Sequence, residues 1–342
     1  MESPPKPFII PVFLPHQGCP HRCIFCDQRA ITGTTAMPDN DTVRTQVDRF
    51  AAYNRRKRQP VQLSFYGGNF LGLPPGEIQR LLDLAEKMVT EGRINSIRFS
   101  TRPDTVTPGR LEILAGYSVT TIELGVQSMD DTILAQAQRG HTAAHTLQAL
   151  NLLREHGFQT GGQIMIGLPG DDGPSSLATA EILSAHRPDF VRIYPTIVIA
   201  GSPLAHRFRR GEYRPLPLKE AVQLAASLRE TFSRHGIPVI RMGLQPTAEL
   251  SRAATVLAGP YHPAFGHLVL SEIAYRRLAA RIRDHRPPLP DCLTIAVHPR
   301  SISVTRGHRN ANLGRLEEAF GFQTVRITGD ASLDNGTIDC RW

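Results

Sequence analysis

The sequence predicts an α/β protein in which parallel strands and helices alternate to form an open or closed β/α barrel, followed by a small α/β appendage. Apolar, β-branched runs alternate with helical patterns along the first two thirds of the 342 residues, which is typical of parallel strands joined by right-handed crossovers. Six such units precede about residue 240, enough for a barrel and too many for a small nucleotide-binding half. The alternation then weakens, and a proline-rich segment at 284–291 precedes a last stretch with its own pattern.

Each strand is predicted from an apolar, β-branched run that is short enough for one strand. The six candidate strands are residues 8–14, 61–67, 96–101, 121–127, 161–169 and 190–196. Helices are predicted between them where apolar side chains recur at helical spacing. In residues 77–89, for example, this apolar face consists of Ile78, Leu81, Leu82, Ala85, Met88 and Val89.

The segments at the ends of these strands are polar or rich in glycine. In a β/α barrel, the carboxyl ends of the strands and the loops after them face the active site. A single such segment need only end its strand, because glycine and proline do so in any fold. Five such segments in matching positions favour a ligand-binding rim. Glu123, in one of them, could equally be a strand residue that is paired within the protein. The five are the loop after the first strand, YGGNF at 66–70, STRPD at 100–104, ELGVQS at 123–128 and GLPG at 167–170.

Three of the five cysteines lie within eight residues, in the spacing C-x3-C-x2-C of Cys19, Cys23 and Cys26. An odd total with three crowded together is unlike a secreted disulfide framework and indicates metal binding or redox chemistry. A structural zinc site takes four ligands, so zinc would need His16 or His21 as the fourth. Thiolates are also the ligands of iron–sulfur clusters. Three thiolates would leave one iron of a four-iron cubane open.

This spacing, with Phe25 before the last cysteine, resembles the signature of the radical S-adenosylmethionine (SAM) superfamily. Within it, the chain resembles the Elongator catalytic-subunit group and, more distantly, oxygen-independent coproporphyrinogen oxidase. The likeness covers roughly residues 8 to 240 and is carried by VFLPHQGCPHRCIFC, FYGGNF, STRPD, ELGVQS, QRGHT, IMIGLPG and RIYPTIVIAGSPL. It implies a partial (β/α)6-type radical SAM barrel and a 4Fe-4S cluster held by Cys19, Cys23 and Cys26. It also implies reductive cleavage of SAM to a 5'-deoxyadenosyl radical that abstracts a substrate hydrogen.

The resemblance further implies which residues contact SAM, whose ammonium needs an acceptor and whose carboxylate needs a cation. Gly67 and Gly68 would let the backbone approach the methionyl amino group, with Asn69 beside them. Ser100 and Arg102 would lie beside the SAM pocket, and the GLPG turn would flank the adenine. The candidates for ribose or carboxylate contacts are Gln127, Arg139 and Gln163. No residue is assigned to the chemistry on the substrate.

The chain departs from the family in two places. The third position of the family's G-G-E or G-G-T motif is Asn69 here. An amide can accept a hydrogen bond from the SAM ammonium but supplies no charge, so we expect SAM binding to survive and, if anything, to weaken. The Elongator catalytic subunit also carries an acetyltransferase domain after its radical SAM domain. Nothing after Gln245 resembles that domain, so we do not expect acetyl transfer.

The sequence predicts a radical SAM barrel domain at 1–245, a connecting and barrel-closing segment at 246–290 and a small α/β appendage at 291–342. In the connecting segment, His262 and His267 are either substrate ligands or acid–base groups, or else exposed loop histidines. Cys292 and Cys340 lie too far apart in the sequence for a second cluster. They are interpreted as a buried residue and a tail residue, respectively.

The appendage is predicted to contain a strand, a short helix or turn, a glycine loop, an amphipathic helix and a strand. With GHRN at 307–310 just before the second helix, this order resembles a KH-type RNA-binding module, in which a G-x-x-G loop clamps a nucleotide backbone. The fourth loop position is Asn310 here instead of glycine. Basic residues around the loop suit phosphate contact, unless they are merely solvated. They are Arg300, Arg306, His308, Arg309 and Arg315.

The formal net charge of +8 favours an anionic partner, of which nucleic acid is the obvious one. No run approaches the roughly 20 apolar residues of a membrane span, and the first residues lack the features of a signal peptide. We therefore expect a cytoplasmic protein that does not engage membranes. Together with the resemblance, this predicts a radical SAM enzyme that acts on RNA, specifically tRNA, with an electron donor such as flavodoxin or ferredoxin. The alternatives are an enzyme acting on a small anionic metabolite such as a porphyrin carboxylate, and a noncatalytic iron–sulfur or RNA-binding protein.

Overall fold

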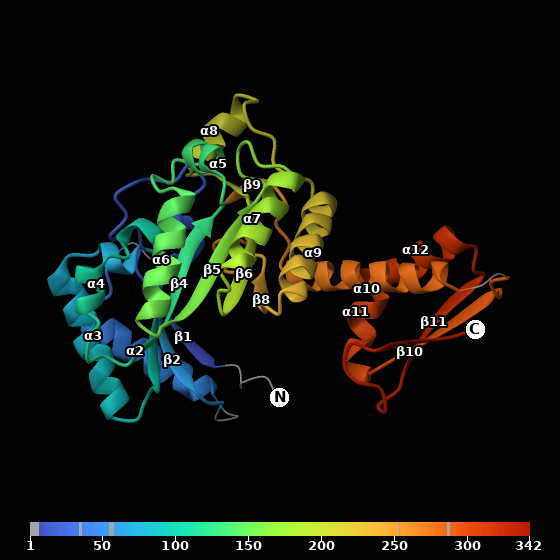
Figure 1. Cartoon of the computed structure of the whole chain (residues 1–342), viewed down its shortest axis with the longest axis horizontal. Coiled ribbons are helices and arrows are strands. Elements are labelled where there is room, and N and C mark those ends of the chain that lie inside the picture. Colours follow the sequence, from blue (N-terminus) through green and yellow to red (C-terminus); the bar gives the residue numbers. More distant parts are fainter. Residues whose placement is uncertain (1–6, 34–35, 55–57, 253, 286–287) are drawn as a thin grey trace.

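The computed structural model describes residues 7–33, 36–54, 58–252, 254–285 and 288–342. Its larger part is a parallel sheet in the order β1-β2-β3-β4-β5-β6-β8, with β1 and β8 at its two edges (Figure 1). The strands are β1 (Phe8–Phe13), β2 (Val61–Tyr66), β3 (Ser96–Thr101), β4 (Val119–Gln127), β5 (Gln159–Ile166), β6 (Phe190–Pro195) and β8 (Val239–Met242). The predicted α/β class and the first six strands are confirmed. The sequence analysis missed β8, a strand of only four residues in which Ile240 is 47% exposed, because so short an edge strand carries little periodicity.

The main core lies between one face of this sheet and helices that cover it (Figure 1). The helices of this part of the chain connect successive strands. They are α1 (Gln28–Thr32), α2 (Asn40–Tyr53), α3 (Pro75–Thr90), α4 (Pro108–Glu112), α5 (Asp131–Gln136), α6 (Ala143–Glu155), α7 (Gly173–Ala185), α8 (Pro203–Arg209) and α9 (Leu218–Arg234), with short 3-10 helices η1 (Phe70–Gly72) and η2 (Pro103–Thr105). Helix α3 contains the helix predicted at 77–89. It starts at Pro75, a first-turn position at which proline loses no helical hydrogen bond.

The two faces of the large sheet differ in polarity. Ile97 and Phe99 of β3 have no exposed surface and belong to the main core. Arg98 and Ser100, the residues that alternate with them, point to the opposite, inner face, because successive side chains of a strand point to opposite sides. Parallel strands of α/β proteins are usually apolar on both faces. The polar inner face is therefore the side of this open barrel that is suited to a polar ligand.

Residues 292–341 form a second sheet in the order β11-β10-β12, with a hydrophobic core of its own. Its elements are β10 (Cys292–Val297), η3 (Pro299–Ser301), α11 (Ile302–Arg306), η4 (His308–Asn310), α12 (Ala311–Phe320), β11 (Thr324–Gly329) and β12 (Ile338–Arg341). Strand β10 pairs parallel with β11 and antiparallel with β12. The order predicted for the appendage is present, but β12 was not predicted. Cys292 is exposed, so the burial predicted for it was wrong, whereas the tail residue Cys340 in β12 is buried.

Helix α10 (Phe265–Arg283) belongs to both cores and runs from the barrel to the appendage (Figure 1). Val269 and Ile273 pack into the main core, whereas Leu278 and Ile282 pack into the core of the appendage. Two short strands pair antiparallel: β7 (Val198–Ile199), which follows β6 in the chain, and β9 (Val256–Ala258), which lies between β8 and α10. The domain boundaries at residues 245 and 290 stay predictions.

In the described part of the chain, no helix combines the length and the apolar character needed to cross a membrane.

Candidate functional site

The three clustered cysteines lie in the loop of residues 14–27 between β1 and α1, here called the cysteine loop. Because the strands run parallel, this loop meets the loops that follow β2 and β3 at one edge of the sheet. Leu14 N–H donates to the Tyr66 carbonyl at 2.7 Å, and Asn69 N–H donates to the Gln17 carbonyl at 2.9 Å. The cysteine loop is therefore held by the backbone of the loop after β2.

Glycines allow these two loops to pack backbone against backbone. A Cβ on Gly68 would lie 2.6 Å from the carbonyl oxygens of Leu14 and Gln17. A Cβ on Gly18, whose φ is +72°, would lie still closer to the Asn69 carbonyl oxygen. No side chain fits at either position, so in this structure Gly68 serves the packing of the cysteine loop. The SAM contacts assigned to Gly67 and Gly68 stay predictions.

Asn69 is fully buried and joins three loops. Its Nδ2 donates to the Gly18 carbonyl at 2.7 Å. Its Oδ1 accepts from Arg102 N–H at 2.9 Å and from the hydroxyls of Thr101 and Thr105 at 2.7 and 2.9 Å. The amide oxygen thus has three donors within the protein. In this conformation, Asn69 positions loops and has no free face for the SAM ammonium, unlike the role that the resemblance implies.

The three thiols share a desolvated setting. Burial, followed by the nearby Cys23, raises the pKa of Cys19 and raises the pKa of Cys26 to about 12. Arg139 Nη1 donates to Cys23 Sγ at 3.1 Å, which places a guanidinium beside the sulfurs. Within the residues that the structure describes, no three Cys, His, Asp or Glu side chains are grouped closely enough to hold a metal ion. Cluster binding would therefore require the loop to bring its sulfurs together.

The donor set nonetheless fits an iron–sulfur cluster. Thiolates are its usual protein ligands, and deprotonating desolvated thiols is favoured when a cation takes the place of the proton. Arg139 supplies further positive charge next to Cys23. Zinc has less support, because His16 Nε2 accepts a hydrogen bond from Gln28 N–H at 3.0 Å. His21 is engaged elsewhere, because its ring packs against Gly140.

The QRGHT segment forms a second support for the cysteine loop. The His21 ring lies so close to Gly140, whose φ is +69°, that a Cβ there would overlap the ring. Arg139 Nη2 donates to the Gly125 carbonyl at 2.7 Å, and His141 Nε2 lies 3.2 Å from the Val126 carbonyl. Burial, and next the charge of Arg139, lowers the pKa of His141 to about 3, so its ring is neutral. The sequence analysis identified Arg139 but missed Gly140 and His141, although both lie in the same motif.

The remaining predicted SAM contacts lie near Arg139 or along the inner face. Arg102 pairs with Asp104 at 2.9 Å and also donates to the Arg139 carbonyl. Gln163 Nε2 lies 3.5 Å from Gln127 Oε1 across β4 and β5. Four buried guanidinium nitrogens among the described residues lack a hydrogen-bond partner, and two of them, Arg102 Nη1 and Arg139 Nε, lie beside the cysteine loop. Ser100 is partly exposed and lies in register with Glu123.

The GLPG turn after β5 is fixed by two polar side chains. Tyr213 OH donates to the Gly167 carbonyl at 2.6 Å, and Asp171 Oδ2 accepts from Gly167 N–H at 2.7 Å. Burial raises the pKa of Asp171 to about 6. The turn is thus preformed, whereas its predicted contact with adenine stays a prediction.

The inner face also contains an ion cluster that the sequence analysis did not assign. Glu123 lies 2.5 Å from Arg98 Nε and 2.8 Å from Arg192 Nε. Tyr66 OH donates to the same carboxylate at 3.0 Å. Two guanidinium groups face one carboxylate, so this buried cluster carries excess positive charge. Glu123 is therefore paired within the protein, which was one of its two predicted roles.

Comparison with known proteins identifies this arrangement. The model of the radical SAM superfamily matches residues 13–175, and that of the radical SAM C-terminal domain matches residues 188–275. An uncharacterised protein of Methanocaldococcus jannaschii is 30% identical over 67% of this chain and 73% of its own length. The chain belongs to the radical SAM superfamily. As a radical SAM protein it is an enzyme by class, and the predicted family is confirmed.

The radical SAM relatives include the tRNA uridine(34) acetyltransferase of Dehalococcoides mccartyi, 26% identical over 62% of this chain. The match covers 53% of that protein, so the chain spans about half the length of this relative. The structure of an archaeal Elp3 from Methanocaldococcus infernus shows the same fold, with a TM-score of 0.60 and 20% identity over 80% of this chain and 63% of that one. The predicted resemblance to the Elongator group is thus confirmed.

Proposed function

We propose that this radical SAM protein binds a 4Fe-4S cluster through Cys19, Cys23 and Cys26, cleaves SAM reductively and acts on RNA. The observation that carries the proposal is the cysteine loop, in which the sulfur of buried Cys23 accepts a hydrogen bond from Arg139 and the backbone is fixed by Asn69. When bound, the cluster would chelate SAM at its open iron and supply the electron that splits the sulfonium into methionine and a 5'-deoxyadenosyl radical.

The residues of the chain would hold and orient SAM. The charges of Arg102 and Arg139 act on the Cys19 thiol, and each of these arginines has one buried N–H group without a hydrogen-bond partner among the described residues. They suit the SAM carboxylate, because a charge-assisted hydrogen bond satisfies both groups. Ser100 and the backbone at 67–68 would line the methionyl end. Gln127 and Gln163 would bind the ribose, and the GLPG turn would exclude water from the adenine.

RNA, specifically tRNA, is proposed as the substrate because a relative is named as a tRNA-modifying enzyme and because the chain carries a net charge of +8. The acetyl transfer in that relative's name is not part of the proposal. An acidic electron-transfer protein, flavodoxin or ferredoxin, would reduce the cluster, and dithionite can replace it in the test.

The test is anaerobic reconstitution with iron and sulfide, followed by dithionite and SAM. The wild-type protein should release 5'-deoxyadenosine and methionine. Cys23→Ala should abolish both iron binding and this release. The matched control is Cys292→Ala, which removes an exposed cysteine outside the loop and should behave as the wild type. A reconstituted wild-type protein that never cleaves SAM would overturn the proposal.

A small anionic metabolite is a second candidate substrate, and the ion cluster of Arg98, Glu123 and Arg192 favours it. Excess positive charge on a buried inner face suits a ligand carboxylate. The two substrate classes separate when tRNA and a protein-free metabolite extract are added in turn to the cleavage assay. Stimulation by tRNA, with a modified nucleoside missing from the tRNA of a deletion strain, supports RNA. Stimulation by the metabolite extract alone supports the second candidate.

A further inference from the structure

Helix α8 packs directly on the part of the cysteine loop that lies between two of its cysteines. Leu204 N–H, in the first turn of α8, donates to the Ile24 carbonyl at 2.7 Å. The apolar cluster at this contact includes Ile24, Phe25, Leu204, Ala205 and Phe208. Ile24 and Phe25 are the two residues between Cys23 and Cys26. A partner bound to the other side of α8 is therefore separated from the cysteine loop by one helix, about 10–12 Å across.

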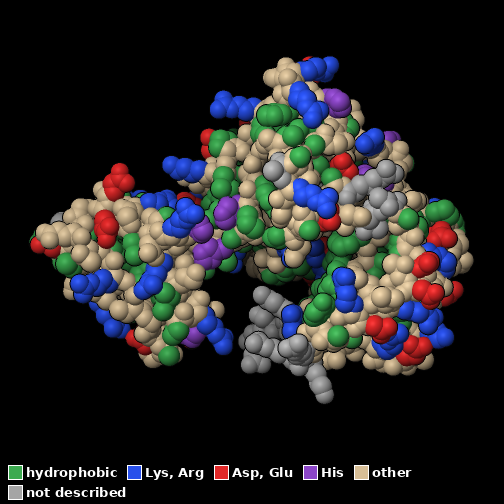
Figure 2. Space-filling model, turned by 180° about the vertical axis from the view of Figure 1, so that it is seen from behind, with side chains coloured by type: hydrophobic (Ala, Val, Ile, Leu, Met, Phe, Trp, Pro, Cys, Tyr) green, Lys and Arg blue, Asp and Glu red, His purple; other side chains and the backbone are tan. Residues whose placement is uncertain are grey.

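That other side of α8 is cationic. His206, Arg209 and Arg210 are exposed, and their spacing of three and four residues places them on one helical face. The stretch 203–214 contains four arginines and one histidine but a single acidic residue, Glu212. Figure 2 shows basic side chains and histidine at the tip of the barrel lobe, where Figure 1 places α8. The α8 patch is defined here as His206, Arg207, Arg209, Arg210 and Arg214.

The positive charge of the α8 patch is largely uncompensated. Arg210 pairs with Glu212 at 2.7 Å, but both side chains are exposed to solvent, so the pair contributes little. Among the described residues, Arg207, Arg209 and Arg214 form no ion pair. Basic residues in a last turn complement the helix dipole, but Arg214 lies beyond the helix, and like charges three or four residues apart repel each other. Stabilisation of α8 does not account for four arginines.

An acidic protein fits the α8 patch better than RNA does. An RNA substrate has to bring its reacting atom to the polar inner face of the sheet, whereas the patch covers the cysteine loop. A reductant has to approach this loop, because electron transfer slows steeply with distance. The patch is also a compact group of charges on a helix of seven residues. Such a group is complementary to carboxylates on a small protein surface, whereas single-stranded RNA is bound along an extended groove.

We propose that the α8 patch is the docking surface for the acidic one-electron carrier protein that reduces the cluster. One electron passes from the reduced carrier to the oxidised cluster, so the carrier is oxidised as the cluster is reduced, and no bond of this chain forms or breaks. Opposite charges speed the encounter of the two proteins. The proposal rests on the cluster in the proposed function and adds the place where its reductant binds.

The first experiment measures binding of purified flavodoxin to the full chain, before and after reconstitution of the cluster. The double variant Arg209→Glu/Arg214→Glu should bind flavodoxin roughly tenfold more weakly, because two attractions become repulsions. Added salt should weaken wild-type binding, since exposed charges are screened. Both positions are exposed, so the fold should be kept. Arg209→Gln/Arg214→Gln, which removes the charges without reversing them, should show a smaller loss in the same direction.

The second experiment compares two reductants. With photoreduced flavodoxin, the double variant Arg209→Glu/Arg214→Glu should release 5'-deoxyadenosine several-fold more slowly than the wild type. With dithionite, a small reductant that needs no docking surface, the two proteins should release it equally fast. Loss of the dithionite-driven reaction as well would mean that these arginines support the cysteine loop itself, and would overturn the docking proposal.

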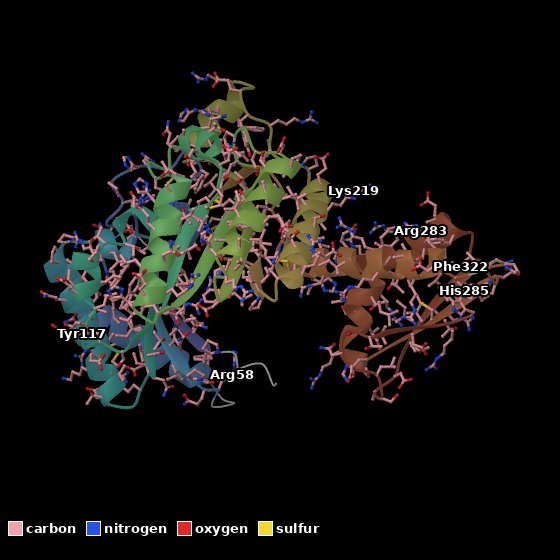
Figure 3. The ribbon with its side chains drawn as sticks, viewed as in Figure 1. Arg58, Tyr117, Lys219, Arg283, His285 and Phe322 are labelled. Carbon is pink, nitrogen blue, oxygen red and sulfur yellow. The ribbon has the colours of Figure 1, made fainter. Side chains whose placement is uncertain are left out.

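The matched control is Arg281→Glu/Arg283→Glu in the last turn of α10. It also reverses two exposed arginines at a helix end, but in the lobe of the appendage, where Figure 3 labels Arg283. This control should bind flavodoxin and respond to both reductants as the wild type does. Equal weakening by the control would mean that net charge alone attracts the carrier. A test variant that binds flavodoxin normally but has lost tRNA binding would make the patch an RNA surface. Either result would overturn the inference.

The two proposals can fail separately in these experiments. A wild-type protein that cleaves SAM with dithionite but binds neither flavodoxin nor ferredoxin would remove the docking surface and leave the radical SAM activity. Binding of flavodoxin that depends on Arg209 and Arg214, in a protein that never cleaves SAM, would support the docking surface and overturn the proposed catalysis.

Discussion

Two buried asparagines, Asn69 in the barrel and Asn312 in the appendage, hold their regions of the molecule together differently. Asn69 uses both ends of its amide to join the loops that follow β1, β2 and β3. Asn312 uses its Nδ2 to bind the carbonyls of Ser271 in α10 and Thr305 in α11. Asn69 thus positions irregular backbone, whereas Asn312 joins preformed helices.

This difference between the two asparagines indicates how strongly each region depends on the packing around it. Gly18 and Arg102 lie in loops, where the Asn69 amide satisfies buried backbone groups that no helix pairs. The carbonyls of Ser271 and Thr305 belong to helices, which impose their own backbone geometry. The barrel site should therefore be lost as a unit when its packing is disturbed, and the appendage should lose stability by degrees.

The largest expected effect is that of Gly68→Ala. A Cβ there would lie 2.6 Å from two backbone carbonyl oxygens, and backbone cannot move aside as a flexible side chain can. The cost should exceed the ~1–3 kcal/mol typical of overpacking. Iron content after reconstitution and release of 5'-deoxyadenosine should both be lost. Gly109→Ala is the control, because no atom lies within 4 Å of the added carbon. Normal iron binding by Gly68→Ala would mean that the cysteine loop does not need this close approach.

Asn69→Ala is expected to have the next largest effect. It leaves the Gly18 carbonyl and the Arg102 N–H without their partner, and each unsatisfied buried group costs about 1–3 kcal/mol. The free energy of unfolding should fall by about 3 kcal/mol, and the iron content should fall with it. Asn69→Asp keeps the acceptor but places a buried carboxylate oxygen against the Gly18 carbonyl, so it should not restore the stability that Asn69→Ala loses. Urea unfolding and iron analysis measure both.

Asn312→Ala is the counterpart in the appendage. It should lower the free energy of unfolding by about 1–3 kcal/mol, as urea unfolding would measure, because the carbonyls of Ser271 and Thr305 lose their buried donor. SAM cleavage should stay at the wild-type level. If Asn312→Ala abolishes cleavage, or Asn69→Ala leaves it intact, the distinction between the two asparagines is wrong.

Much of the fold could be predicted because its signals are local. Six strands follow from short apolar runs, and the three cysteines follow from spacing within one loop. The helix at 77–89 lies within α3, as its periodicity required. Strand β12 was missed because Ile338–Arg341 contains two charged residues and carries no apolar run.

The site contacts could not be predicted because they join distant segments. The partners of Asn69 come from Gly18, Thr101, Arg102 and Thr105, and no spacing in the sequence connects these residues. Glycine at position 140 becomes necessary only when the His21 ring is seen to lie on it. The pairing of Glu123 with Arg98 and Arg192 likewise depends on the register of three strands.

The pH dependence of stability should have opposite directions in the two regions. Burial raises the pKa of Asp171 from 3.8 to about 6, so the folded state binds this proton more tightly than the unfolded chain does. The resulting stabilisation is complete below about pH 4 and is lost as pH rises through about 6, up to about 3 kcal/mol in all. Asp171→Asn should remove this loss, as urea unfolding across that range would measure.

Exposed Asp330 in the appendage is the control for Asp171. A hydrogen bond from the Ser332 hydroxyl, with the backbone N–H of Ser332 next, lowers its pKa. Its small stabilisation is therefore present above its ordinary pKa and is lost as pH falls through the lowered value. Asp330→Asn should therefore lower stability slightly above the ordinary pKa and leave it unchanged at the acid end. Parallel pH profiles for wild type and Asp171→Asn would contradict the role assigned to burial.

The smallest predicted effect is a gain in stability, whereas Gly68→Ala should lose stability. Gly314 lies inside α12, and a Cβ there would meet no atom within 4 Å. Glycine in a helix interior costs ~0.5–1 kcal/mol relative to alanine, because more backbone freedom is lost on folding. Gly314→Ala should therefore slow hydrogen exchange of the α12 amides by a few-fold and leave iron content unchanged. Faster exchange would mean that α12 needs the backbone freedom of Gly314. Glycine would then be required in the appendage, as it is in the barrel site.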